Sequence, residues 1–275
     1  MSEVKMVVTD LDGTLLQTDQ SISPTDQETL ERLGILGVCR VAATGRNLFK
    51  VRQVLNENTP FDYVIVSSGA GIMDWKAQKL IQAMSIPATA TGEIIHFLIG
   101  ENQNFKVSRE LPDNHNFAWW ESYDCPELTR YVEHHKKFGD AVKIDPEKPF
   151  IASQILMFFP GESNQFEVMK EKIQSKFPDL SIIRTTSPLD PKYTWMEIFP
   201  NGVSKAHGIE EICRITGIAR ENTLGIGNDF NDLEMLDFTQ HSYVVGNAPE
   251  ELKIRYLISL AHFDDGFSHA VNKHL

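Results

Sequence analysis

Asp10 and Asp12 are the residues of this chain that most directly suggest chemistry, because two carboxylates stand two residues apart. They follow a short apolar run that begins at Lys5 and is typical of a buried parallel strand, and Gly13 would let the backbone turn sharply after them. One carboxylate could attack a phosphorus atom while the other donates a proton to the leaving alcohol and then activates water. The alternative is an Asx-type turn in which both carboxylates only bind backbone amides.

Thr44 and Lys205 stand at comparable positions elsewhere in the chain. Thr44 closes a predicted strand, 38–44, and precedes Gly45. Its hydroxyl could bind a phosphate oxygen there, since ligands of open α/β sheets lie beyond the carboxyl ends of the strands. Lys205 opens a predicted helix, and beside two carboxylates its ammonium would neutralise a nucleophile and an incoming phosphate. Taken singly, Thr44 could be a helix cap and Lys205 a solvated surface lysine.

A dense group of oxygen donors follows a predicted strand at 223–227. Such donors suit Mg²⁺, which prefers oxygen ligands and keeps several waters. Capping of the next helix is the alternative, and one residue could do both. The donors are Asn228, Asp229, Asn231 and Asp232.

The segments around these residues alternate between strand and helix. Ser23 and Pro24 signal a helix start, and Gly37 signals its end before the strand that carries Thr44. The same alternation returns after residue 200. This order predicts an α/β fold with a doubly wound parallel, Rossmann-like core sheet.

The middle of the chain has a different character, with more aromatic residues and strand-like runs around one helical stretch. We interpret it as an inserted α+β cap domain at 85–199, which leaves 1–84 and 200–275 as the core domain. Strands are predicted at 151–159, 181–184 and 194–199, with a helix near 167–177.

The composition narrows the classes of partner. The formal net charge of −12 disfavours nucleic acid, whereas a bound divalent cation could reverse the sign locally for a small phosphorylated substrate. No stretch is long and apolar enough to span a membrane, so no membrane partner is expected. Three widely spaced cysteines, and no secretory signal pattern, favour the reducing cytoplasm.

In this order, the four groups resemble the motifs of the haloacid dehalogenase-like superfamily of phosphatases, and within it the Cof-type group with a large α/β cap. The resemblance covers most of the core. It extends to the stretches Ser67–Ala70, Glu197-Ile198, Val245–Glu250 and Asp264–Phe267.

The resemblance implies that Asp10 is the nucleophile, Asp12 the general acid and base, and Thr44, with Gly45, a phosphoryl-binding group. Lys205 would hold Asp10 and the phosphate together. It also implies Mg²⁺, bound by Asp10, the carbonyl of Asp12 and the later donors. That family usually has aspartate where this chain has Asn228, so Asp229 could take over its part. The metal candidates are Asp10, Asp12, Asn228, Asp229 and Asp232.

We therefore expect a magnesium-dependent phosphatase that hydrolyses a small phosphorylated metabolite, such as a sugar phosphate, through an aspartyl-phosphate. In the cap, Arg109 and His115 lie near Trp119 and Trp120 in the sequence and are candidates for substrate binding; the two indoles could instead pack the cap's own core. Arg46 is expected to brace nearby carboxylates. The alternatives are a phosphotransferase or phosphomutase that uses the same intermediate, and a non-catalytic binding protein.

Overall fold

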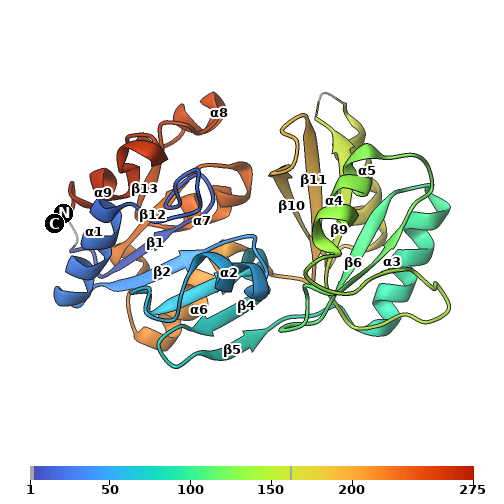
Figure 1. Ribbon diagram of the computed structural model, residues 1–275, viewed down its shortest axis with the longest axis horizontal. Coiled ribbons are helices and arrows are strands. Elements are labelled where there is room, and N and C mark those ends of the chain that lie inside the picture. The colour runs from blue at the N-terminus through green and yellow to red at the C-terminus, as the bar shows by residue number, and fades with distance from the viewer. Residues whose placement is uncertain (1–2, 162) are drawn as a thin grey trace. The chain divides into compact units, whose positions relative to one another are not determined.

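The computed structural model describes residues 3–161 and 163–275, in which the chain forms two compact units (Figure 1). The core unit comprises Met1–Arg46, Lys50–Gln82 and Ser204–Leu275, and the inserted unit comprises Asn47–Phe49 and Ala83–Val203. None of the helices in these described ranges has both the length and the apolarity that a membrane span requires.

An eight-stranded sheet forms the centre of the core unit. The strands from β14 to β3 pair in parallel, as the alternation of strands and helices predicts, while β3 and β4 pair antiparallel. The pair β4 and β5 was not predicted. In spatial order the strands are β14 (Leu257–Ile258), β13 (His241–Val244), β12 (Thr223–Gly227), β1 (Met6–Thr9), β2 (Cys39–Ala43), β3 (Tyr63–Val66), β4 (Gly71–Asp74) and β5 (Lys79–Ala83).

The helices of the core pack on this sheet through apolar side chains. An apolar cluster joins Ile209 of α6 and Met235 of α7 to Met6 and Val41 of the central strands. Helix α1 packs against β2 and α9, and its first turn is capped by Ser23, whose Oγ accepts the amide of Asp26 at 3.1 Å. The helices are α1 (Pro24–Ile35), α2 (Leu48–Val54), α6 (Lys205–Thr216), α7 (Leu233–Phe238), α8 (Glu250–Lys253) and α9 (Gly266–Val271).

A six-stranded, mostly antiparallel sheet forms the inserted unit, and only β7 and β8 pair in parallel. Of its strands, β9, β10 and β11 lie close to the predicted ranges, whereas β6, β7 and β8 were not predicted. In spatial order the strands are β10 (Ser181–Thr186), β11 (Tyr193–Phe199), β9 (Ala152–Pro160), β6 (Phe105–Arg109), β7 (Phe117–Trp120) and β8 (Ala141–Lys143).

The two faces of this sheet carry different helices. Helices α3 (Ala88–Gly100) and α5 (Gln165–Lys176) share one large apolar cluster with alternate residues of the strands. Helix α4 (Pro126–His135) joins a smaller cluster with the other set of alternate residues. Trp120 packs against the first cluster and Trp119 against the second, so both indoles pack within the inserted unit.

Candidate active site

Three adjacent strands of the core sheet, β12, β1 and β2, run parallel and end at the same edge. Asp10 follows β1, Thr44 follows β2 and Asn228 follows β12. The amide of Asp10 still donates to the carbonyl of Ile226 at 2.9 Å, so the sheet itself sets the position of the carboxylate. The structure thus brings together three residues that are far apart in the sequence, because parallel strands share one carboxyl edge.

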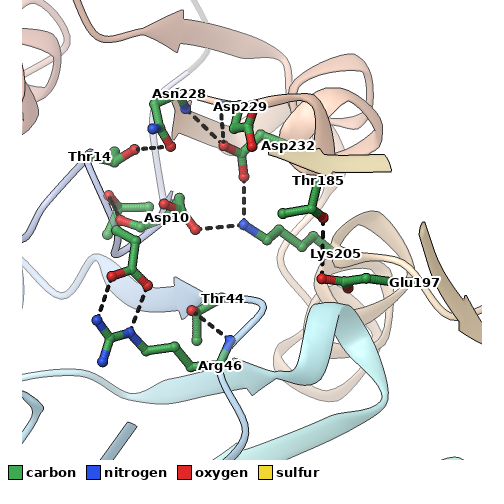
Figure 2. Close-up of polar contacts among 12 residues, drawn as sticks. Asp10, Thr14, Thr44, Arg46, Thr185, Glu197, Lys205, Asn228, Asp229 and Asp232 are labelled. Atoms are coloured by element: carbon green, nitrogen blue, oxygen red, sulfur yellow. Dashed lines mark hydrogen bonds and ion pairs between the residues drawn. The ribbon is translucent and has the colours of Figure 1, made fainter. Parts of the chain in front are cut away.

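Lys205 lies at the centre of this edge, as Figure 2 shows. Its ammonium Nζ is 2.6 Å from Asp10 Oδ1 and 2.6 Å from Asp232 Oδ1. Ser204 is the N-cap of α6, and its Oγ accepts a hydrogen bond from the amide of His207. The helix therefore begins at the next residue, Lys205. All three charged side chains are buried, so a single cation is shared between two carboxylates.

Burial acts in opposite directions on the pKa values of Asp10 and Lys205. Burial raises the pKa of Asp10 to about 7; Lys205 opposes this effect, and Asp232 and Asp12 add to it. Burial alone would lower the pKa of Lys205, but Asp10 and Asp232 outweigh it and raise that pKa above its ordinary value. The lysine therefore stays charged at neutral pH, while Asp10 binds a proton more readily than an exposed aspartate.

Asp12 does not contact Lys205 in this arrangement; its side chain is exposed and pairs with Arg46. The Arg46 guanidinium donates from Nε to Asp12 Oδ2 at 2.7 Å and from a second nitrogen to Oδ1, a bidentate geometry. The second nitrogen also donates to Gln20. The expectation that Arg46 braces a nearby carboxylate thus corresponds to a specific contact, which fixes the orientation of the Asp12 carboxylate.

Thr44 is buried, and its hydroxyl accepts the amide of Arg46 at 3.1 Å across Gly45. Its own carbonyl accepts the amide of Ser68 at 2.9 Å. Ser68 belongs to a turn that ends at Gly69, where φ is +111° and any Cβ would lie 2.1 Å from the carbonyl oxygen of Ser204. The Thr44 loop and the start of α6 are therefore packed on the same turn, and only glycine allows that approach.

The donors after β12 form a closely hydrogen-bonded loop. Asp232 Oδ2 accepts the amides of Asn228 at 2.8 Å and Asp229 at 3.1 Å. Asp229 and Asp232 also form a capping box on the short helix that follows. A Cβ on Gly227 would lie 2.6 Å from the Asp232 carboxyl group, so this tight loop requires glycine.

The oxygen donors of this edge determine whether it suits a metal. In residues 3–161 and 163–275, no three His, Cys, Asp or Glu side chains are grouped so that they could hold a metal ion. Mg²⁺ needs fewer protein ligands, since one or two side-chain oxygens and a carbonyl suffice with water. No hydrogen bond within the described residues reaches Asp10 Oδ2, and Asn228 Oδ1 accepts one, from Thr14 Oγ1 at 3.1 Å. The donor set therefore fits Mg²⁺.

The two candidates from the predicted cap, Arg109 and His115, both lie in the inserted unit. Arg109 is exposed, and its guanidinium carbon lies 3.8 Å from the centroid of the Phe150 ring. The His115 ring stacks on Phe49 at a centroid distance of 4.9 Å, and its Nδ1 is buried without a hydrogen-bond partner among the described residues. Their part in substrate binding stays a prediction.

Two relationships at this edge were not foreseen. Asp232 was expected among the metal donors, but both of its oxygens accept hydrogen bonds from Lys205 and the loop amides. Thr14 had no expected role, yet its hydroxyl donates to Asn228. The contacts of Lys205 with Asp232 and of Thr14 with Asn228 join residues more than 25 positions apart, so no local sequence signal could have revealed them.

Comparison with known proteins places this arrangement in context. The sequence pattern of the family described as haloacid dehalogenase-like hydrolase matches residues 7–271. An HMP-PP phosphatase of Serratia proteamaculans (strain 568) is 24% identical over 250 residues, which are 90% of this chain and 86% of that protein. A 5-amino-6-(5-phospho-D-ribitylamino)uracil phosphatase of Bacillus subtilis (strain 168) is 23% identical over 266 residues, which are 91% of this chain and 90% of that protein.

The structural comparison agrees with the sequence match. A haloacid dehalogenase-like hydrolase from B. subtilis superimposes with a TM-score of 0.78 and 20% identity, covering 99% of this chain and all of that one. At this identity the likeness shows a shared fold. It confirms the predicted fold class, a parallel α/β core with a second, inserted sheet.

Proposed function

The chain belongs to the family of haloacid dehalogenase-like hydrolases, and on that premise we propose that it is a magnesium-dependent phosphatase of a small phosphorylated metabolite. The reaction would pass through a phosphorylated Asp10. The observation that carries this proposal is the buried contact in which Lys205 Nζ lies 2.6 Å from Asp10 Oδ1, at the carboxyl edge of the sheet. The curated relatives, which are named phosphatases, support the same reaction class.

Asp10 is the proposed nucleophile because one of its oxygens is held by Lys205 and the other accepts no hydrogen bond within the described residues. Attack by Oδ2 on phosphorus forms the Asp10–phosphate bond and breaks the bond from phosphorus to the leaving oxygen. Lys205 would offset the negative charge of the nucleophile and of the arriving phosphoryl group, in a buried environment where the attraction is strong. Thr44 and the Gly45 backbone would bind the phosphoryl oxygens.

Asp12 is the proposed general acid and base. In the first half of the reaction it donates a proton to the leaving oxygen, and in the second it takes a proton from the water that attacks the aspartyl-phosphate. That attack releases inorganic phosphate and restores the Asp10 carboxylate. Arg46 would act as a positioning residue, because its bidentate contact orients the Asp12 carboxylate.

The proposed metal site consists of the Asp10 carboxylate, the carbonyl of Asp12 and Asn228 Oδ1, with Asp229 as the alternative side chain; the Asp10 oxygen that attacks phosphorus is not the one that would bind the metal. When bound there, Mg²⁺ would neutralise phosphoryl charge that Lys205 alone leaves uncompensated. Asp232 has a different proposed role, since its hydrogen bonds hold Lys205 and the loop. The cytoplasm remains the proposed compartment, in keeping with the three cysteines, which are all free thiols.

A phosphate-release assay tests this proposal. Purified protein should release phosphate from p-nitrophenyl phosphate and from a panel of phosphorylated metabolites, and chelation of Mg²⁺ with EDTA should stop it. Rapid acid quenching should trap phosphate on the wild-type protein and none on Asp10→Asn. Turnover without any trapped phosphoenzyme would exclude the covalent route, and no turnover on any substrate would exclude the phosphatase.

A further inference from the structure

One outer edge of the core sheet carries exposed apolar side chains that the proposed reaction does not use. Strand β14 is the last strand on this side, and among the described residues it pairs only with β13. We call the exposed apolar residues in and around β14 the apolar edge; their exposed fractions run from 47% to 85%. The apolar edge consists of Ile254, Leu257, Ile258, Leu260 and Phe263.

The density of the apolar edge is unusual for a protein surface. Large apolar side chains are often exposed singly, whereas here five lie within ten consecutive positions, 254–263. Leu257 and Ile258 point to opposite faces of the sheet, as neighbouring residues of a strand do, and each is about half exposed. Neither face of the sheet is therefore fully covered at β14.

The backbone of β14 leaves one residue available to pair with a further strand. Ile258 lies opposite Val244 in the register, and the amide of Ser259 donates to the carbonyl of Val244 at 2.8 Å. In a parallel pair, the residues on either side of the opposed one make the hydrogen bonds, so Leu257 and Ser259 face β13. The amide and the carbonyl of Ile258 therefore point outward, away from β13.

This edge is both unprotected and ordered. Monomeric proteins commonly protect an edge strand with lysine, proline or a bulge, but residues 257–260 read Leu-Ile-Ser-Leu. The carbonyl of Leu260 accepts the amide of Gly246 at 3.0 Å, and Ser259 Oγ donates to the carbonyl of Gly266 at 2.6 Å. A partner strand would meet a segment that is already held in place, which lowers the entropy cost of association.

The geometry of the edge favours a second copy of this chain as the partner. A strand that runs antiparallel to its own copy is related to it by a two-fold axis, the commonest symmetry of protein dimers. With the axis at Ile258, the two copies exchange both backbone hydrogen bonds of that residue. The same register brings Ile254 of one copy toward Phe263 of the other at each end, so that apolar residues meet apolar residues.

The charged residues beside the apolar edge do not oppose this pairing. Lys253 is paired with Glu250 at 2.8 Å, and Arg255 with Asp237 at 3.2 Å. The five apolar side chains would bury of the order of 1,000 Å² in total over the two copies, which is the size of weak, reversible interfaces. A dissociation constant in the micromolar range is therefore expected.

We infer that β14 pairs antiparallel with β14 of a second copy, so that the apolar edge forms the interface of a weak, reversible homodimer. The two core sheets then continue into each other across the two-fold axis. This inference does not depend on the proposed phosphatase function, since β13 and β12 separate the interface from β1, which Asp10 follows.

Sedimentation velocity of the full chain, from about 2 to about 200 µM, tests the inference. In about 0.15 M NaCl the repulsion between two chains of net charge −12 is screened beyond about 8 Å. The wild type should change from monomer to dimer across this range. Ile258→Pro removes the outward amide and no hydrogen bond to β13, and it should raise the dissociation constant about tenfold or more. Ile254→Lys should do the same, because it places a charge in the interface.

Ile215→Lys is the matched control. Ile215 is an exposed isoleucine of α6 outside the apolar edge, and its replacement should leave the dissociation constant unchanged. Ile254 is the most exposed member of the apolar edge, so Ile254→Lys tests the inference even if circular dichroism shows that Ile258→Pro does not fold. A wild type that stays monomeric at about 200 µM would overturn the inference. A wild-type dissociation constant in either folded variant would also overturn it.

Discussion

The Lys205 ammonium lies 2.6 Å from Asp232 Oδ1, the same distance that separates it from Asp10 Oδ1. Asp232 in turn accepts the backbone amides of Asn228 and Asp229. One buried cation therefore links the proposed nucleophile to the loop that carries the proposed metal ligand. Any change in this contact should affect the stability of the core as well as its chemistry.

Replacement of Lys205 by Met should destabilise the protein by about 3–5 kcal/mol at pH 8, because it leaves Asp10 and Asp232 buried without a cation. Lys205 lowers the pKa of Asp10, which is about 7 in its presence, so that pKa rises further in the variant. Protonation then removes the unpaired charge, and the loss should shrink as the pH falls from 8 to 5. Urea unfolding of both proteins at pH 5 and pH 8, without Mg²⁺, measures the loss in the free energy of unfolding and its change with pH.

The control for this prediction is the double variant Lys205→Met/Asp232→Asn, which removes one of the two buried charges. It should recover part of the stability that Lys205→Met loses at pH 8. A loss that is the same at pH 5 and pH 8 would contradict the electrostatic explanation and point to packing.

Asp10→Asn should reduce phosphate release by about 10³-fold or more, because an amide oxygen is too poor a nucleophile to form the aspartyl-phosphate. The measurement is turnover of p-nitrophenyl phosphate at saturating Mg²⁺. Asp179→Asn, an exposed aspartate of the inserted unit, is the matched control and should retain full activity. Wild-type turnover in Asp10→Asn would exclude Asp10 as the nucleophile.

Arg46→Gln should lower kcat about tenfold on alkyl phosphates, with a smaller change in KM, because the Asp12 carboxylate loses its bidentate partner. The effect should be weaker with p-nitrophenyl phosphate, since nitrophenolate leaves without a proton from Asp12. Asp12→Asn should show the same contrast more strongly, and Arg52→Gln, on α2, serves as the control. Equal losses on both leaving groups would contradict a role through Asp12 as the general acid, because its role as the base in the second half of the reaction is the same for both substrates.

Asn228→Ala and Asp229→Ala should separate metal binding from helix capping. If Asn228 Oδ1 binds Mg²⁺, its removal should weaken Mg²⁺ binding about tenfold in calorimetric titration of the protein. Asp229 caps the short helix before α7, so Asp229→Ala should mainly lower the free energy of unfolding, by about 1 kcal/mol. The opposite pattern would make Asp229 the ligand, and unchanged Mg²⁺ binding in both would exclude the proposed site.

Lys106 of β6, which is buried in the inserted unit, should make stability depend on pH. Its pKa is about 7 in the folded chain against 10.5 for an exposed lysine, since burial disfavours the charged form despite Glu197; the ring of Tyr131 also faces the ammonium, at 5.5 Å. At any pH below 10.5, folding must therefore remove a proton from Lys106. The free-energy cost of removing this proton is largest below pH 7 and disappears as the pH rises toward 10.5. The cost is of the order of 3–5 kcal/mol.

Lys106→Met should consequently be more stable than the wild type at pH 7, or less destabilised than its lost hydrogen bonds to Ser108 and Gln154 suggest. As the pH rises to 10, the free energy of unfolding of the variant should fall relative to that of the wild type. Guanidinium unfolding of both proteins at pH 7, 8.5 and 10 gives this trend. Lys143→Met, whose lysine is exposed, should show no such trend. A difference in the free energy of unfolding between wild type and Lys106→Met that stays the same at all three pH values would contradict the lowered pKa of Lys106.

The elements that carry the proposed chemistry were largely predictable from local sequence. The strand Thr223–Gly227 and the start of α6 at Lys205 have the predicted bounds, because apolar runs, glycine and capping residues act within a few positions. The strands β6, β7 and β8 lacked such clear signals. In β7 both faces are apolar, since Ala118 and Trp120 pack with one cluster and Phe117 and Trp119 with the other, so this strand shows no apolar and polar alternation along the sequence.

The sequence by itself determined which residues follow the ends of the parallel strands, and hence that Asp10, Thr44 and the Asn228–Asp232 donors belong to one edge of a sheet. Tertiary structure alone decided how their charges are paired. It assigned Asp232 to Lys205 and the loop amides, and Asp12 to Arg46. Pairing depends on distances of a few ångströms between side chains from separate segments, and residue type and spacing along the chain do not encode those distances locally.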